Sequence, residues 1–336
     1  MPRQRPVTIR DVAALAGVSV GTVSKALNGR GSLRPDTVDR VRQAAQRLDF
    51  RPNPAARGLQ AGRSYTVGMI TTDTIGRFSI PLLIGAEDTL GAGQISVLLC
   101  DARDDAIRER HHLDVLLGRR VDGIIVTGRR AGTRAPIDGN PGVPVVYAFL
   151  ASADPADCSI VPDEAGGARQ AVDHLRTAGR RRLVHITGPE HHHSARVRAQ
   201  AIEAHLAEQG SALVTPPLFG EWSEAWGRQA AGILLARGTE FDGVLGGNDQ
   251  IARGAGDALR EAGRAVPAAV ALTGFDNWDV MALASRPTLT SIDMDLEGLG
   301  RAAAGLLLRA IDGDAAPGVH VHPARLVIRD STVRAG

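Results

Sequence analysis

The chain contains few cysteines, few aromatic residues and no long apolar run. Its 336 residues include 2 cysteines, and aromatic residues make up 3% of the chain. Cys100 and Cys158 do not form a C-x-x-C pair, so we expect reduced thiols rather than a disulfide framework. No apolar run reaches the length of a membrane-spanning helix. These absences exclude a disulfide-stabilised small domain and a helical membrane protein.

The common catalytic motifs are also missing. There is no P-loop, no G-x-G-x-x-G after a strand pattern and no H-E-x-x-H. The G-x-S-x-G pattern of hydrolases occurs once, at Gly17–Gly21, with Ser19 in the nucleophile position. That motif needs a strand before the serine, whereas a helical pattern precedes Ser19. We therefore expect no catalytic residues, no cofactor and no metal.

What the sequence does contain is a basic N-terminal segment. Residues 1–63 hold 12 Lys and Arg against 4 Asp, a net charge of +8, whereas the other 273 residues hold 27 basic and 33 acidic groups, a net −6. A basic segment of this kind favours a polyanion, because each cation placed near a phosphate releases condensed counterions. A disordered basic tail would carry the same charge, but this segment is patterned.

The pattern predicts three short helices. Thr8 followed by Asp11 is typical of an N-cap with an acid at N3, and Gly17 would end the first helix. Ser19 would cap a second helix at once, and a third would run from Pro35 to about residue 48. The side chains predicted to form the small core are Val12, Ala13, Leu15, Ala16, Val23, Ala26, Leu27, Val38, Val41, Ala45 and Leu48.

Two short helices joined through a tight turn fit a helix-turn-helix. Residues 8–28, TIRDVAALAGVSVGTVSKALN, resemble the DNA-binding head of the lactose-repressor (LacI/GalR) family of bacterial transcription regulators. Residues 51–59, RPNPAARGL, resemble the hinge segment of that family. The resemblance implies an all-α helix-turn-helix head over residues 1–50, a hinge over 51–63 and a two-lobed effector-binding and dimerisation domain over 64–336.

The resemblance places the DNA contacts on the second helix and the hinge. Recognition helices read base edges from their N-terminal end. Val20 can touch a thymine methyl group, and Lys25 can reach guanine but lacks the planar fork of arginine. A solvated helix face is the alternative reading. The expected DNA-binding residues are Thr8, Ser19, Val20, Gly21, Thr22, Ser24, Lys25, Asn28, Asn53, Arg57 and Leu59.

The hinge carries a separate expectation. In the family this segment becomes helical only on DNA, where two copies pair and a leucine wedges between base steps at the operator centre. Leu59 is the matching residue. Gly58 costs such a helix up to about 1 kcal/mol relative to alanine, so the hinge should depend strongly on DNA and a partner subunit. A plain interdomain linker is the alternative, since Pro52 and Pro54 would suit one.

From about Tyr65 the chain alternates strand and helix patterns, which predicts a parallel α/β sheet. Apolar runs lie at 66–70, 95–100, 123–126, 143–149, 183–186, 244–246 and 270–275. Amphipathic stretches lie between them, for example at 82–90, 165–175, 199–206 and 251–259. About 270 residues exceed one doubly wound unit, so two lobes are expected.

The resemblance supplies the arrangement of these lobes. In the family the body is an α/β two-lobed, periplasmic-binding-protein-like core with parallel sheets. Its chain crosses between the lobes three times and holds a small ligand in the cleft. We place the crossings near residues 159–163, 291–293 and 320–323.

Ligands of open α/β sheets bind beyond the carboxyl ends of the strands. Family members place an effector-binding arginine at the position of Arg198. Aromatic rings pack on the C–H faces of sugars and polar groups take the hydroxyls, so the composition favours a sugar or polyol. Asn248 and Asp276 have an alternative role as helix caps, and Trp222 as ordinary core. The expected effector-binding residues are Asp73, Phe78, Phe149, His192, Arg198, Trp222, Asn248 and Asp276.

Two features depart from the common family pattern. Arg77 stands where many relatives have a small or apolar residue, and His191–His193 precede the arginine motif. Both could line the cleft entrance, and His192 could make effector binding sensitive to pH. An exposed loop is the alternative for the histidines. They are not a metal site, because consecutive residues point in different directions.

The body alone would also resemble an exported sugar-binding protein. Export needs an apolar stretch behind a basic start, and residues 1–13 contain none, so we expect a cytoplasmic protein. No heptad tail follows the body, so a C2 homodimer is expected. The expected function is a transcriptional repressor that binds a pseudo-palindromic double-stranded DNA operator and is controlled by a small-molecule effector. Induction, corepression and activation all stay open.

Overall fold

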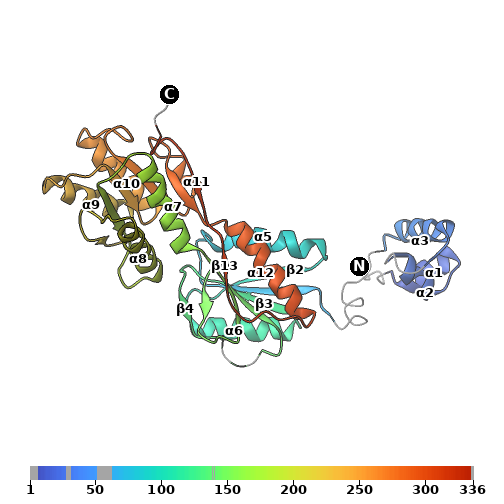
Figure 1. The fold of residues 1–336 in the computed structure, drawn as a ribbon. Helices are drawn as coiled ribbons and strands as arrows, with labels where there is room; N and C mark the ends of the chain where they lie inside the picture. Colours follow the sequence, from blue (N-terminus) through green and yellow to red (C-terminus); the bar gives the residue numbers. More distant parts are fainter. Residues whose placement is uncertain (1–6, 28–31, 51–62, 138, 140, 334–336) are drawn as a thin grey trace, which may run out of the picture. The chain divides into compact units, whose positions relative to one another are not determined.

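The computed structural model describes residues 7–27, 32–50, 63–137, 139 and 141–333 (Figure 1). The chain forms two compact units, Met1–Tyr65 and Thr66–Gly336, which we call the head and the body. Four residues expected to contact DNA lie outside the described ranges, and so does nearly all of the predicted hinge. These four are Asn28, Asn53, Arg57 and Leu59.

Local capping explains where the helices of the head begin and end. The backbone N–H and the hydroxyl of Thr8 each donate a hydrogen bond of 2.7 Å to the Asp11 carboxylate. Gly17 ends the first helix in the left-handed conformation, with φ 66°. Ser19 accepts the Thr22 amide at 3.1 Å and so caps the second helix. The helices are α1 (Ile9–Ala16), α2 (Val20–Leu27) and α3 (Pro35–Arg47).

Three valines, Val12, Val23 and Val41, are fully buried at the centre of the head, and small alanines surround them. Leu15 was predicted to join this core, but half of its surface is exposed, at 50%. That prediction was wrong. The inward stripe of α1 is narrow in a three-helix unit, and Leu15 lies beside the stripe rather than on it.

The body contains two six-stranded sheets within the described ranges, in the orders β13-β7-β5-β3-β1-β2 and β14-β12-β11-β10-β8-β9. Neighbouring strands are parallel except β12 and β14. The first sheet contains β1 (Thr66–Thr71), β2 (Ser96–Asp101), β3 (Gly123–Val126), β5 (Val145–Ala148), β7 (Cys158–Pro162) and β13 (Gly318–His322). The second contains β8 (Leu183–Thr187), β9 (Leu218–Phe219), β10 (Gly243–Gly246), β11 (Ala271–Phe275), β12 (Thr290–Asp293) and β14 (Arg325–Val327).

Helices pack on both sheets, as buried parallel strands require. We call the first sheet with its helices the first lobe and the second sheet with its helices the second lobe (Figure 1). The helices of the first lobe are α5 (Ser79–Ala92), α6 (Ala106–Gly118) and α12 (Leu296–Ile311). Those of the second lobe are α7 (Glu164–Thr177), α8 (His193–Glu208), α9 (Glu224–Ala236), α10 (Asp249–Glu261) and α11 (Asp279–Ala282).

The chain passes from one sheet to the other after β7, after β12 and after β13. The three segments where we placed the crossings contain the last residues of these strands. A two-stranded ladder of β4 (Thr133–Arg134) and β6 (Ala151–Ser152) adjoins the first sheet. The carboxyl ends of the parallel strands therefore meet where the lobes face each other.

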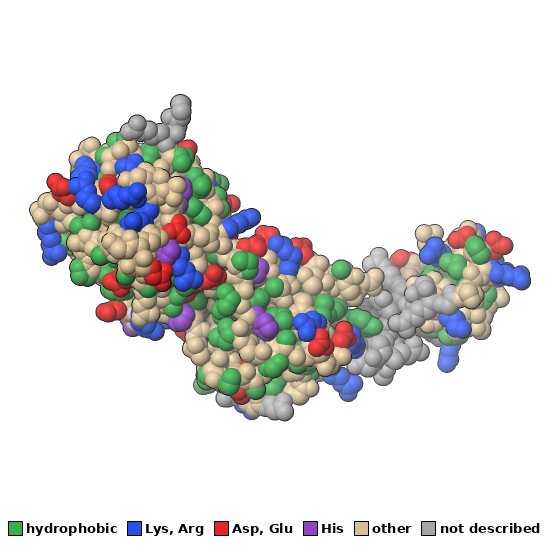
Figure 2. Space-filling model, viewed as in Figure 1, with side chains coloured by type: hydrophobic (Ala, Val, Ile, Leu, Met, Phe, Trp, Pro, Cys, Tyr) green, Lys and Arg blue, Asp and Glu red, His purple; other side chains and the backbone are tan. Residues whose placement is uncertain are grey.

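The visible surface of the body carries interspersed acidic and basic side chains (Figure 2). None of the helices in the described ranges combines the length and the apolar character needed to span a bilayer.

In each lobe, a pair of glycines allows two helices to pack closely against each other. A β-carbon at Gly85 would lie 1.9 Å from a backbone oxygen of α12, and one at Gly300 would lie 2.2 Å from a backbone oxygen of α5. In the second lobe the same reciprocal contact joins α9 and α10 through Gly227 and Gly254, at 2.1 Å and 2.0 Å. No side chain fits at these positions, so the glycines set how closely the helices pack.

Replacing Gly300 by alanine should destabilise the body by about 1–3 kcal/mol, because α5 and α12 must move apart. Gly305 lies on the same helix and has no atom within 4 Å of its would-be β-carbon. Gly305→Ala should therefore stabilise the helix by up to about 1 kcal/mol. Urea unfolding of both variants measures the difference. Equal stability of the two variants would contradict the close packing described here.

Candidate functional site

The N-terminal face of α2 is exposed on the head. Val20 is 41% exposed, and Ser19, Gly21 and Lys25 are exposed beside it. The Ser19 hydroxyl accepts a backbone hydrogen bond and is also bonded to the Thr22 hydroxyl, so it can donate to an outside acceptor when Thr22 is the donor of that pair. The hydroxyl of Thr8 is already donated to a carboxylate within the head.

Thr22 and Ser24 are partly buried, and the Thr22 hydroxyl lies 2.9 Å from that of Ser19. A helix precedes Ser19, as the sequence predicted, and the capping bond accounts for the serine. The arrangement is that of a helix-turn-helix, in which the second helix presents its start to a groove.

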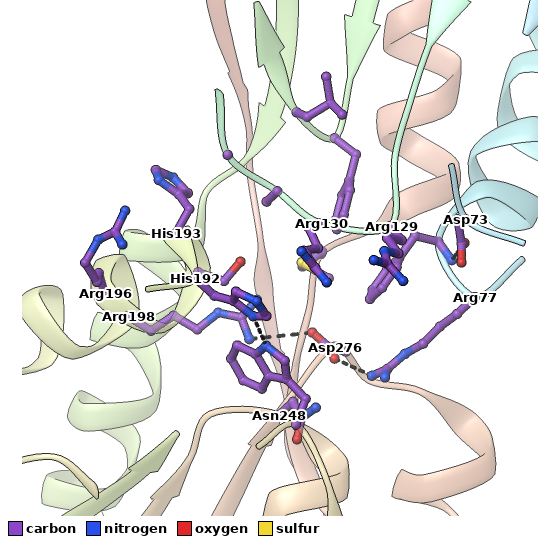
Figure 3. Close-up of a pocket in the computed structure, with 18 of the residues that line it drawn as sticks. Asp73, Arg77, Arg129, Arg130, His192, His193, Arg196, Arg198, Asn248 and Asp276 are labelled. Carbon is purple, nitrogen blue, oxygen red and sulfur yellow. Dashed lines mark hydrogen bonds and ion pairs between the residues drawn. The ribbon is translucent and has the colours of Figure 1, made fainter. Parts of the chain in front are cut away.

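A cavity of about 750 Å³ lies between the lobes (Figure 3). It is large enough for a mono- or disaccharide-sized ligand. All eight residues that the sequence assigned to an effector line this cavity: Asp73, Phe78, Phe149, His192, Arg198, Trp222, Asn248 and Asp276.

Aromatic rings form the apolar part of the wall. Phe78 and Phe149 of the first lobe stack with their ring centroids 4.8 Å apart. Trp222 of the second lobe is only partly buried, and its indole N–H donates to His192 Nδ1 at 2.8 Å. Trp222 therefore lines the cavity and also packs against the apolar core of the second lobe. Trp278, which the sequence did not suggest, adds a fourth ring.

Two of the polar residues have structural roles at helix ends. Asp73 Oδ2 accepts the amides of Phe78 and Ser79 at 2.7 Å and 2.9 Å, which holds the start of α5. Asn248 Oδ1 accepts the Ile251 amide at 2.8 Å and caps α10. Asn248 therefore has the capping role that the sequence offered as its alternative. Its amide group donates to no described residue and remains available to the cavity.

A chain of opposite charges crosses the cavity between the lobes. Arg77 of the first lobe donates to the Asp276 carboxylate and, at 3.0 Å, to Gln250 Oε1, both in the second lobe. Arg198 donates to Glu164 Oε1 at 2.6 Å and lies 3.6 Å from the other oxygen of Asp276. Figure 3 shows both links to Asp276. Asp276 is therefore an ion-pair partner rather than a helix cap.

Arg198 is 4% exposed and lies 3.5 Å above the centroid of the Phe275 ring. The ion pair with Glu164 makes the burial of its charge possible. Substitution of Arg198 would therefore remove the ion-pair partner of Glu164 as well as part of the cavity wall.

The three consecutive histidines, His191–His193, differ in burial. His192 is partly buried and precedes α8, whereas His191 and His193 are exposed. Partial burial lowers the pKa of His192, and the charges of Arg130, His191 and Arg129 lower it further against the opposite effect of Glu221. The lowered pKa favours the neutral form of the ring. Within the described residues no group of three His, Cys, Asp or Glu is placed to hold a metal ion.

Several residues of the cavity wall were missed by the sequence reasoning. Arg129 and Arg130 follow the carboxyl end of β3, so the strand-end rule could have found them. Gln250 lies in the first turn of α10, next to the predicted Asn248. The missed polar and aromatic residues include Arg129, Arg130, Arg134, Ser194, Arg196, Gln250 and Trp278.

Asp249 is buried beneath the cavity floor. Its carboxylate accepts the Ser291 hydroxyl at 2.5 Å and the Trp278 amide at 2.7 Å. Burial, with the nearby charge of Asp276, raises the pKa of Asp249 from 3.8 to about 7. Between pH 3.8 and about pH 7, Asp249 keeps its proton in the folded state but has lost it in the unfolded state. The contribution of Asp249 to the free energy of unfolding is therefore lost as the pH rises through this window.

Asp249→Asn should remove that component of the pH dependence. We expect the free energy of unfolding of the wild type, relative to the variant, to fall between pH ~4 and pH ~7. Urea unfolding of both proteins at a series of pH values measures it. Other groups, such as His185, whose pKa burial lowers to about 4, act alike in both proteins. An unchanged difference across the window would show that Asp249 is ionised throughout.

Comparison with known proteins agrees with both parts of the chain. A family model of bacterial regulatory proteins of the LacI family matches residues 8–53, and one of periplasmic binding protein-like domains matches residues 172–332. The HTH-type transcriptional regulator PtxS of Pseudomonas aeruginosa is 31% identical, over 99% of this chain and 97% of its own length.

Two solved structures extend the similarity to the fold. The lac repressor dimer bound to operator and an anti-inducer has a TM-score of 0.76 and 27% identity, covering 98% of this chain and 100% of that one. The complex of the transcriptional regulator CelR with cellobiose has a TM-score of 0.68 and 29% identity, covering 97% and 100%. These relatives are regulators and not enzymes. This chain belongs to the LacI family of bacterial transcriptional regulators.

Proposed function

We propose that this regulator represses transcription by binding a pseudo-palindromic operator as a homodimer, and that a sugar or polyol in the cavity controls it. One observation carries the proposal. The same chain combines a helix-turn-helix whose second helix is open at its start with a ligand-sized cavity between two lobes. Such a regulator works where the chromosome is, so we place it in the cytoplasm.

The exposed residues at the start of α2 support base readout. Val20 offers an apolar contact for a thymine methyl group, and Lys25 offers a cation for guanine or phosphate. Gly21 has no side chain to read with. Specificity then depends on few side chains in each half-site, and two half-sites in a dimer supply the rest.

The cavity wall supports a polyhydroxylated ligand. Four rings provide faces for C–H groups, while the Asn248 amide and the Arg and Asp side chains provide donors and acceptors for hydroxyls. The similar regulator CelR forms a complex with cellobiose, which supports a saccharide as the ligand of this chain.

The ion pair of Arg77 with Asp276 gives the ligand a way to act on DNA binding. A ligand that competes for either partner changes the free energy of the lobe arrangement that this pair stabilises. The lobe arrangement would set the spacing of the two hinges of a dimer, and so whether both Leu59 side chains enter the minor groove. The sign of the response depends on which arrangement the ligand favours.

Lys25→Ala should weaken binding to the operator by about 1–3 kcal/mol per half-site contact, with a much smaller effect on nonspecific DNA. Fragments of the source genome selected by the purified protein supply the operator. Arg47→Ala, at the end of α3, serves as the control, because it removes a charge without touching the start of α2. Equal loss on specific and nonspecific DNA would contradict base readout by α2.

Lys25 is the only lysine of the chain, so an amine-reactive label reports on it alone apart from the N-terminal amine. We expect the operator to protect Lys25 from labelling at a salt concentration that abolishes nonspecific binding. Full reactivity of Lys25 in the specific complex would exclude it from the interface.

Asn248→Ser separates the cap from the ligand contact, because serine caps helices about as well as asparagine but lacks the amide donors. The variant should keep the melting temperature of the free protein and lose most of the upward shift caused by the effector. Differential scanning fluorimetry over a panel of sugars and polyols measures both. An undiminished shift would remove Asn248 from the binding site.

A further inference from the structure

The cations on the cavity wall fall into two groups. Arg77, Arg134 and Arg198 each have a carboxylate partner, in Asp276, Glu109 and Glu164 respectively. The remaining cations and the histidines form a second group, which we call the basic rim. The basic rim consists of Arg129, Arg130, His191, His192, His193 and Arg196.

The charges of the basic rim are poorly compensated. Arg130 has no hydrogen bond or ion pair with any residue in the described part of the chain. Arg196 donates only to backbone carbonyls, of Glu190 and His191, which carry no net charge. Arg129 pairs with Asp104 at 3.2 Å, but about half of each side chain is exposed, so solvent screens the pair.

The acids of the wall do not offset this charge. Asp73 and Asp276 are the two carboxylates that line the cavity, among the residues described. Asp73 is held by the amides at the start of α5, and Asp276 by Arg77 and Arg198. The charge of Glu221 raises the pKa of His192, but the guanidinium groups of Arg130 and Arg129 act against it. The rim therefore presents net positive charge to the cavity.

Backbone groups add to this potential. Helix α8 has 16 residues, begins at His193 and has neither a side-chain cap nor an acid in its first turn. Ser194, in that turn, lines the cavity. The amides at the start of a helix carry partial positive charge, which favours an anion.

The basic rim draws on both lobes. Arg129 and Arg130 come from the first lobe, and Figure 3 shows them between His192 on one side and Asp73 on the other. The histidines and Arg196 come from the second lobe. The two parts approach closely, since a β-carbon at Gly132 would lie 3.2 Å from that of His193. A ligand group held at the rim would contact both lobes and so favour one arrangement of them.

We propose that the effector carries an anionic group, a carboxylate or a phosphate, on its polyol body, and that the basic rim binds this group. Charge-assisted hydrogen bonds from Arg130 and Arg129 hold the anion, while the aromatic rings hold the carbon skeleton. The class of effector is therefore a sugar acid or a sugar phosphate. This inference rests on the proposed function, which places an effector in this cavity.

Matched ligand pairs test the charge directly. Calorimetric titration of the full chain compares aldonic and uronic acids with their neutral alditols and sugars, for example D-gluconate with D-glucitol. The same titration compares each sugar phosphate with the unphosphorylated sugar. The anionic member should bind about tenfold to hundredfold more tightly, and added salt should reduce that preference. Preference for the acids identifies a carboxylate, and preference for the phosphates identifies a phosphate.

A variant assigns the effect to the rim. Arg130→Gln should remove the preference for the anionic member and leave the affinity for its neutral counterpart nearly unchanged. Arg309→Gln is the matched control, because Arg309 lies on α12 and pairs with Asp314 away from the cavity. Equal losses for both members of a pair would mean that Arg130 acts by shape, and would overturn the proposal.

The outcomes also separate this inference from the proposed function. Binding of neutral sugars with equal or greater affinity than the anions would overturn the anionic effector and keep the sugar-controlled regulator. Binding of no ligand of either class would overturn both statements about the effector. The protection of Lys25 by operator DNA tests the regulator independently of any ligand.

Discussion

One run of buried charge joins the two lobes across the cavity, from Glu164 through Arg198 and Asp276 to Arg77. Each lobe also has an apolar cluster and a close helix pair of its own, and a larger apolar cluster contains residues of both lobes. The ion pair of Arg77 with Asp276 exists only while the lobes face each other. A buried charge without its partner costs about 3–5 kcal/mol, so the cavity must either keep this run of pairs or replace a member with a ligand.

This constraint makes ligand binding and lobe arrangement one equilibrium. Polar groups of a ligand that reach Asp276 or Arg198 take up interactions that otherwise hold the lobes together. A group that reached Arg130 would add an interaction, since Arg130 has no hydrogen bond or ion pair in the described part of the chain. By our two proposals, hydroxyl groups bind near Asp276 and Arg198, and an anionic group binds at the basic rim. The similarity to the lac repressor covers 98% of this chain and so includes both the head and the body.

Much of the fold was predictable because its signals are local. Thr8 with Asp11, Gly17 and Ser19 mark helix ends within a few residues, and the structure makes the corresponding bonds. The strand ends predicted the cavity for a topological reason, since parallel strands share one carboxyl edge. The amphipathic stretches named as examples did not include α6, α9 or α12. In α6 the apolar residues do not gather on one face of the helix, so a periodic pattern is hard to read there.

The sequence by itself determined the class of protein, the caps of the head helices and the residues near the cleft, because these depend on short-range patterns and on strand order. The tertiary structure decided what those residues do. Asn248 is a cap with a free amide, and Asp276 is not a cap but the partner of Arg77, 199 positions away in the chain. Pairing between distant charges sets which cations are neutralised and which face the cavity, and no local pattern encodes it. That Arg130 has no hydrogen bond or ion pair within the described ranges became visible only when the lobes were seen together.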